Sequence, residues 1–134
     1  YRLYGGDGTL QGEKYIQHGI LGEEILRSEG YPETVWRIAS HHTGTGLTSD
    51  DIEQQKLPLP PGDYTAGTIE ERLVMYADKF HSKTEPPTLN SIQWYRHHIG
   101  QFGARKVGEF DALVREFGEP DLSPIAAKHA VAIK

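Results

Sequence analysis

Helical spacing of apolar residues is the feature that most limits the fold of this 134-residue chain. Between residues 13 and 29, Ile16, Leu21 and Ile25 recur at the spacing of an amphipathic helix. The same helical spacing returns in five later segments, which are separated by stretches that contain glycine or proline. These segments are 32–42, 48–55, 68–83, 88–117 and from 123 onward. No segment alternates polar and apolar residues as a half-buried strand does. The sequence therefore predicts an all-α fold.

Start and stop signals divide these helices. Thr68 and Glu71 have the spacing of a capping box, which is the clearest helix start in the chain. Gly100 and Gly103 allow a kink or a break, so the segment 88–117 can be one helix or two. We expect a single helical domain, divided into a loop at 1–12, helices that carry the candidate site at 13–83, and C-terminal helices at 88–134.

Composition and charge exclude several classes of partner. The chain has 14 Lys and Arg against 19 Asp and Glu, and the absence of a long basic run argues against binding of a nucleic-acid duplex. No apolar run approaches the roughly 18 residues of a membrane span, so we expect a cytoplasmic protein that contacts no membrane. Trp36 and Trp94 do not interleave with basic residues, which favours packing over base stacking.

Cysteine is absent, so any metal ion must be held by histidines and carboxylates. Three such residues occupy positions that helical periodicity would give to hydrophobic ones, and they come from three separate predicted helices: His18, His42 and Asp78. On the first helix, His18 shares its face with Leu21, Gly22 and Ile25. Imidazole and carboxylate ligands that converge suit a divalent transition metal. The alternatives are hydrogen-bonded core histidines and an aspartate that pairs with Arg37, Arg72 or Arg96.

Residues beside these three are weaker candidates. His41 lies about 100° around the helix from His42, where it could orient a ligand, contact substrate or lie at the surface. Lys79 and Lys83 could contact phosphoryl oxygens, although a cationic stripe near a helix end is often only a solvated face. His81 is close enough in sequence to Asp78 to hydrogen-bond near the same position.

Three runs of sequence resemble the later part of an HD-domain phosphohydrolase: IQHGILGEEIL, HHTGTGL and EERLVMYADKFHSK. In that helical superfamily a histidine, an adjacent His-Asp pair and a distant aspartate hold a metal, and members with two metals add further histidines. The resemblance implies that His18 and His42 are these added ligands and that Asp78 is the closing aspartate. It also implies one or two divalent ions (Fe, Mn or Zn), hydrolysis of a small phosphorylated substrate, with a nucleotide as the favoured class, and association into a homo-oligomer as one option.

The chain departs from the family pattern at its start. It contains no His-Asp dipeptide, and no histidine precedes His18. We therefore expect an N-terminally truncated fragment of an HD-domain-like helical bundle, whose intact form would be the enzyme. The alternative is a non-catalytic HD-like module that binds a ligand or has a regulatory role.

Overall fold

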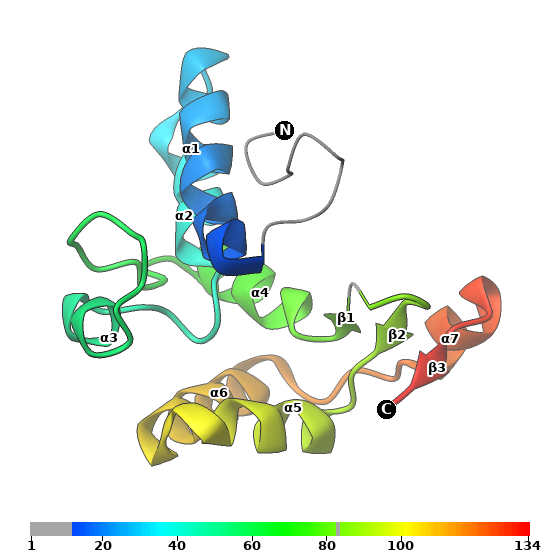
Figure 1. Cartoon of the computed structure of the whole chain (residues 1–134). Helices are drawn as coiled ribbons and strands as arrows, with labels where there is room; N and C mark the ends of the chain where they lie inside the picture. Colours follow the sequence, from blue (N-terminus) through cyan, green and yellow to red (C-terminus); the bar gives the residue numbers. More distant parts are fainter. Residues whose placement is uncertain (1–11, 83) are drawn as a thin grey trace. The chain divides into compact units, whose positions relative to one another are not determined.

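A computed structural model describes residues 12–82 and 84–134, which form two compact units (Figure 1). The first unit comprises residues 1–71 and the second comprises residues 72–134. Most of the predicted loop at 1–12, as well as Lys83, lies outside the described residues. The single-domain expectation stays a prediction, and each unit is described by itself.

Two packed helices dominate the first unit, α1 (His18–Ser28) and α2 (Glu33–His41). A short 3-10 helix, η1 (Gly12–Gln17), leads into α1, so the first turns of the predicted helix are wound more tightly than an α-helix. Close approach of α1 and α2 depends on Gly19, where an added Cβ atom would lie 2.6 Å from the Ala39 carbonyl oxygen. A Cβ atom on Gly22 would lie 3.3 Å from the Ala39 Cβ atom. The two glycines therefore set the distance between the helices.

The prediction of which side of α1 faces inward is correct only near Gly19 and Gly22. Ile25, which was predicted to share the inward face with His18, is 62% exposed. Contact with α2 is centred on Gly19 and Gly22, and the last turn of α1 extends beyond it.

A short helix, α3 (Ser49–Gln54), begins at a reciprocal capping box that was predicted only as a Thr48 cap. The Thr48 hydroxyl accepts from the Asp51 backbone N–H at 3.2 Å, and the Asp51 carboxylate accepts from the Thr48 N–H at 3.0 Å. The proline-containing segment that follows returns at Tyr64, which pairs with Leu47.

Helix α4 (Ile69–Asp78) begins in the first unit and ends in the second. Its predicted capping box is confirmed, because the Glu71 backbone N–H donates to the Thr68 hydroxyl at 3.2 Å. The helix is shorter than the predicted 68–83, since strand β1 (His81–Ser82) follows it and pairs with β2 (Thr88–Leu89).

Helices and a small sheet make up the second unit. Gly103, with φ of +104°, breaks the segment 88–117, which was predicted as one helix or two. The structure has two α-helices joined by a 3-10 turn: α5 (Ile92–Ile99), η2 (Gly100–Phe102) and α6 (Ala104–Phe117). A last helix, α7 (Ser123–His129), leads to β3 (Ala132–Ile133), which pairs in parallel with β2. The sheet was not predicted, because two-residue strands are too short to show alternation.

The core of the second unit is aromatic. Phe110 on α6 is fully buried, and its ring lies 4.8 Å from Tyr95 and 6.1 Å from Tyr76. The Tyr76 hydroxyl donates to the Gly118 carbonyl at 2.6 Å, which satisfies its polar end within the core. In the described parts of the chain, no helix combines the length and the apolar character that crossing a membrane requires.

Candidate metal centre

The two predicted histidine ligands of the first unit meet in the structure. His18 is the first residue of α1 and His42 directly follows the last residue of α2. Their Nε2 atoms lie 2.9 Å apart, and their ring planes are inclined by 66°. The close packing of α1 on α2 at Gly19 brings the two imidazoles together.

Backbone carbonyls orient both rings from the opposite side. His18 Nδ1 donates to the Tyr15 carbonyl at 2.7 Å, and His42 Nδ1 donates to the Ala39 carbonyl at 2.8 Å. A carbonyl oxygen only accepts hydrogen bonds, so each Nδ1 carries a proton and each Nε2 atom faces the other ring. This arrangement is typical of histidines that bind metal ions.

Facing lone pairs repel each other unless a cation lies between or beside them, and that cation can be a proton or a metal ion. Nitrogen ligands lie about 2.0–2.1 Å from a bound zinc, so two of them at tetrahedral positions lie roughly 3.3–3.4 Å apart. The His18 and His42 Nε2 atoms are 2.9 Å apart, so the two rings would have to move slightly apart to bind zinc between them. Within residues 12–82 and 84–134, no group of three or more histidines and carboxylates that could hold a metal ion is found.

Asp78, the third predicted ligand, is the last residue of α4 and belongs to the second unit. Its Oδ2 atom accepts from Lys79 Nζ at 2.9 Å, and its side chain is 42% exposed. Two of the arginines considered as its partners bind other carboxylates: Arg72 binds Glu116 and Arg96 binds Asp111. Its participation in a site with the two histidines stays a prediction.

Lys79 is not part of a solvated cationic stripe, which was one interpretation of its position. The residue is 4% exposed, and its ammonium group is directed to Asp78. His81 is exposed on β1. Contact of Lys79 or Lys83 with a substrate stays a prediction.

His41 is buried, so the interpretation of this residue as a surface histidine is wrong. Its Nδ1 atom lies 2.7 Å from the Ser40 hydroxyl and 3.1 Å from the Arg37 carbonyl oxygen. Burial, aided by the positive charge of Arg37, lowers the pKa of the His41 imidazole. The neutral ring therefore packs inside the first unit beside Tyr64, at 5.8 Å between ring centroids.

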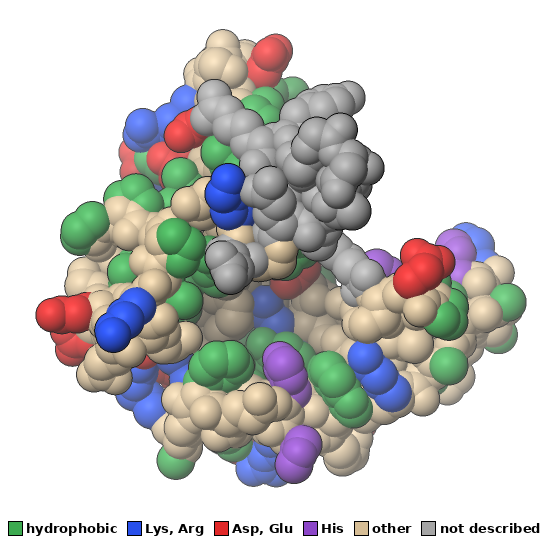
Figure 2. Space-filling view, viewed as in Figure 1, with side chains coloured by type: hydrophobic (Ala, Val, Ile, Leu, Met, Phe, Trp, Pro, Cys, Tyr) green, Lys and Arg blue, Asp and Glu red, His purple; other side chains and the backbone are tan. Residues whose placement is uncertain are grey.

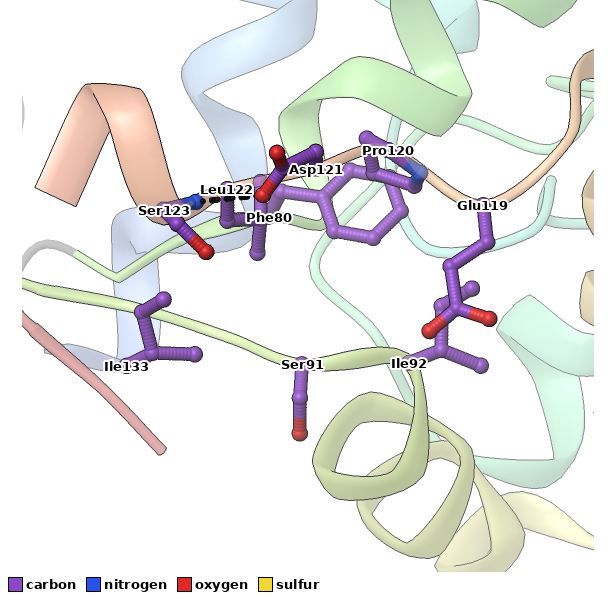
Figure 3. Close-up of a pocket in the computed structure, with 9 residues that line it drawn as sticks. All are labelled: Phe80, Ser91, Ile92, Glu119, Pro120, Asp121, Leu122, Ser123 and Ile133. Atoms are coloured by element: carbon purple, nitrogen blue, oxygen red, sulfur yellow. Dashed lines mark hydrogen bonds between the residues drawn. The ribbon is translucent and has the colours of Figure 1, made fainter.

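A pocket of about 390 Å³ in the second unit has different chemistry (Figure 3). Glu119 and Asp121 line it together with Phe80 and Ser91, and the Asp121 carboxylate accepts from the Ser123 backbone N–H at 3.0 Å. These acidic groups would repel a phosphorylated substrate. The predicted ligands are not among the residues that line this pocket.

Comparison with known families decides the identity of the fold. The model of the HD domain family matches residues 4–83, which include both histidines and Asp78. The chain belongs to the HD domain family. The predicted HD-like helical fold is therefore confirmed. No solved structure matches the chain.

Curated relatives of this HD domain are longer proteins. The chain is 46% identical over 67 residues to a tRNA (cytidine(56)-2'-O)-methyltransferase of Picrophilus torridus, a match that covers 50% of the chain and 19% of the relative. It is 44% identical over 77 residues to the Thermoplasma volcanium protein of the same name, covering 58% of the chain and 22% of the relative. An uncharacterised protein of Methanocaldococcus jannaschii is 46% identical over 77 residues, a match that covers 58% of the chain and 44% of that protein. The HD domain chain spans less than half the length of each of these relatives.

A partly buried ion pair lies near the histidine pair of the HD domain, and sequence reasoning missed it. Glu71 is 2% exposed, and its Oε1 atom accepts from Arg37 Nε at 2.8 Å. Its Oε2 atom accepts from the Gly67 backbone N–H at 2.6 Å. Glu71 was predicted only as part of the capping box, because Arg37 lies 34 residues away. The ion pair joins the last turns of α2, which precede His42, to the start of α4.

Glu71→Gln is expected to lower the free energy of unfolding by about 1–3 kcal/mol at pH 7, because Arg37 loses its charged partner. Burial raises the pKa of the Glu71 carboxyl, but the hydrogen bonds from Arg37 and the Gly67 N–H outweigh it and hold that pKa below its usual value. A lowered folded pKa means that the stabilisation is present above the ordinary glutamate pKa of about 4.3 and is lost as the pH falls through the folded pKa.

Urea unfolding of the wild type and of Glu71→Gln between pH 7 and pH 3 measures this contribution. The difference between the two proteins should shrink as the pH falls. A constant difference over that range would contradict the role of the Glu71 charge. Glu70→Gln, which removes an exposed carboxylate from the same turn of α4, is the control.

Proposed function

We propose that this HD domain hydrolyses a small phosphate ester, with a nucleotide as the favoured class, and that His18, His42 and Asp78 bind the required divalent transition metal. The observation that carries the proposal is the 2.9 Å approach of the His18 and His42 Nε2 atoms, with each Nδ1 bonded to a carbonyl. Membership of the HD domain family supports the same chemistry.

When bound at such a site, a divalent metal activates water and neutralises charge on phosphoryl oxygens. The residues of the chain would bind the metal ion and orient the side chains that hold it. Tyr15 and Ala39 carbonyls hold the two imidazoles in the tautomer that presents Nε2. Lys79 Nζ donates to the Asp78 carboxylate and fixes its direction. His41, held by Ser40 and Arg37, would keep the end of α2 in place beneath His42.

Metal reconstitution tests the proposal. The chain is treated with EDTA, dialysed, and loaded in turn with Mn²⁺, Fe²⁺ or Zn²⁺. Bound metal is measured by mass spectrometry, and phosphate release is measured with nucleoside monophosphates, nucleoside triphosphates and dinucleoside tetraphosphates. We expect stoichiometric metal and metal-dependent hydrolysis of at least one substrate, both reduced in Asp78→Asn. A reconstituted chain that retains no more metal than a His18→Ala, His42→Ala double variant would refute the proposal.

A second candidate function is a non-catalytic accessory module. Two relatives are named as tRNA methyltransferases, and the matched part covers only 19% and 22% of their lengths. The remainder of each relative is long enough to carry the methyltransferase activity, which leaves the matched part as an accessory module. Calorimetry separates the two: nucleotide binding without turnover in the metal-loaded chain would support the module, whereas turnover would support the hydrolase.

A further inference from the structure

Aromatic side chains follow one line along the α5 helix and the η2 turn. Trp94, His98 and Phe102 are four residues apart, and Lys134 comes from the other end of the second unit. Together these four residues are termed the α5 stripe. The Trp94 and His98 rings are stacked at 5.2 Å with only 9° between their planes, and the His98 ring meets Phe102 at 6.3 Å. Lys134 Nζ lies 4.2 Å from the Trp94 ring centroid.

Core packing does not explain the α5 stripe. The buried residues of α5 are Tyr95 and Ile99, and Tyr95 packs on Phe110 of α6. Phe102 is 51% exposed, and Trp94 and His98 are partly exposed. The exposed Phe102 ring lacks the free energy that full burial would give it, whereas Trp94 and His98 are half-buried and stacked on each other. This alignment points to a partner with flat faces.

The net formal charge of the second unit favours an anionic partner, although Asp111 of α6 pairs with Arg96 of α5. Residues 86–108, which contain α5, have no Asp or Glu, and neither do residues 122–134, which contain Lys134. Residues 72–134 carry nine Lys and Arg against seven Asp and Glu, whereas residues 1–71 carry five against twelve. Figure 2 shows histidine and hydrophobic side chains together on the face over α5. The second unit therefore has the opposite formal charge to the first.

We propose that the α5 stripe binds single-stranded nucleic acid. Bases would stack on the exposed aromatic rings, chiefly Phe102, and Lys134 would contact a phosphate. Eight residues of helix rise about 12 Å, which is enough for a strand of two or three nucleotides. Bases in a duplex are already stacked on each other and cannot reach such rings, so the proposal agrees with the expected lack of duplex binding.

This proposal goes beyond the proposed hydrolase and does not depend on the metal site. It differs from the sequence-based interpretation of Trp94 as a packing residue, which was drawn from the lack of basic residues interleaved with it. The cation beside Trp94 comes from a residue 40 positions later in the chain, which local sequence cannot indicate. The pairing of β2 with β3 brings the C-terminal segment beside the start of α5, where the Ser91 backbone N–H donates to the Lys134 carbonyl at 2.6 Å.

Tryptophan fluorescence tests the proposal with a matched control in the same chain. The protein has two tryptophans, and Trp36 also has a cation over its ring, Arg27 at 4.0 Å. In the Trp36→Phe variant, a ten-nucleotide RNA or DNA strand of mixed uridine (or thymidine) and adenosine should quench the Trp94 emission saturably at low salt. In the Trp94→Phe variant, emission from Trp36 should not change. A comparison of the affinities for the RNA strand and the DNA strand shows which of the two the α5 stripe prefers.

Phe102→Ala in the Trp36→Phe background should weaken binding about 5- to 150-fold, the range expected for one stacked base. Lys134→Ala should reduce the salt dependence by the amount expected for one phosphate contact, a slope change of about 0.7. Circular dichroism confirms that each variant is folded. EDTA should leave binding unchanged, whereas it would abolish the proposed hydrolysis. The proposal is overturned by absent quenching, by equal affinity for a duplex, by an unchanged affinity in Phe102→Ala, or by preferential binding to vesicles of anionic phosphatidylserine.

Discussion

Replacement of His42 by alanine is expected to weaken the binding of Mn²⁺, Fe²⁺ or Zn²⁺ by at least about 100-fold. Removal of a group that only orients a ligand costs about 10- to 100-fold in metal affinity, and removal of the ligand itself should cost at least as much. The expectation rests on the orientation of the ring. Its Nδ1 is bonded to the Ala39 carbonyl, so Nε2 is the atom that presents a lone pair, and it faces the corresponding atom of His18. His18→Ala should cause a loss of similar size.

Competition of each variant with a chelating dye measures this loss directly and needs no substrate. His97→Ala is the matched control, because His97 is an exposed histidine of the second unit that was not predicted as a ligand. Thermal melting in EDTA checks that His42→Ala remains folded. Equal metal affinity of His42→Ala and His97→Ala would show that the facing imidazoles do not bind metal, and the proposed hydrolase would then lose its main support.

Gly19→Ala is expected to lower the free energy of unfolding by about 3 kcal/mol, the upper part of the usual range for overpacking. An added Cβ atom would lie 2.6 Å from the Ala39 carbonyl oxygen, which is a backbone atom and cannot rotate away. The loss should exceed the roughly 1 kcal/mol by which alanine is favoured over glycine in a helix. The same displacement of α1 from α2 should separate His18 from His42 and reduce metal affinity.

Gly108→Ala provides the control for this substitution. Gly108 lies inside α6, and an added Cβ atom would have no neighbour within 4 Å. This variant should gain up to about 1 kcal/mol from helix propensity alone. Urea unfolding followed by circular dichroism measures both variants. A stable Gly19→Ala variant with unchanged metal affinity would contradict the role assigned to this contact.

The meeting of His18 with His42 could be predicted because both positions follow from local helical periodicity. The same reasoning predicted the Thr68–Glu71 capping box, whose residues lie within one turn. Interactions between distant parts of the chain left no such local signal. Arg37 and Glu71 are 34 residues apart, and the burial of Lys79 depends on the packing of the whole second unit. The three two-residue strands were missed because each is too short to show an alternating pattern, and β3 pairs with a strand more than 40 positions earlier in the chain.

The Glu71 side chain has the length and the charge that its two partners require. Its two carboxylate oxygens have separate partners, Arg37 on α2 and the Gly67 N–H ahead of α4. Aspartate would keep the charge, but its side chain is one carbon shorter and could not reach both partners without a backbone shift. Glutamine would keep the length, but it would leave the guanidinium without an anion. A second change at position 37, to a residue without a charge, should therefore recover part of the stability that is lost when Glu71 is replaced.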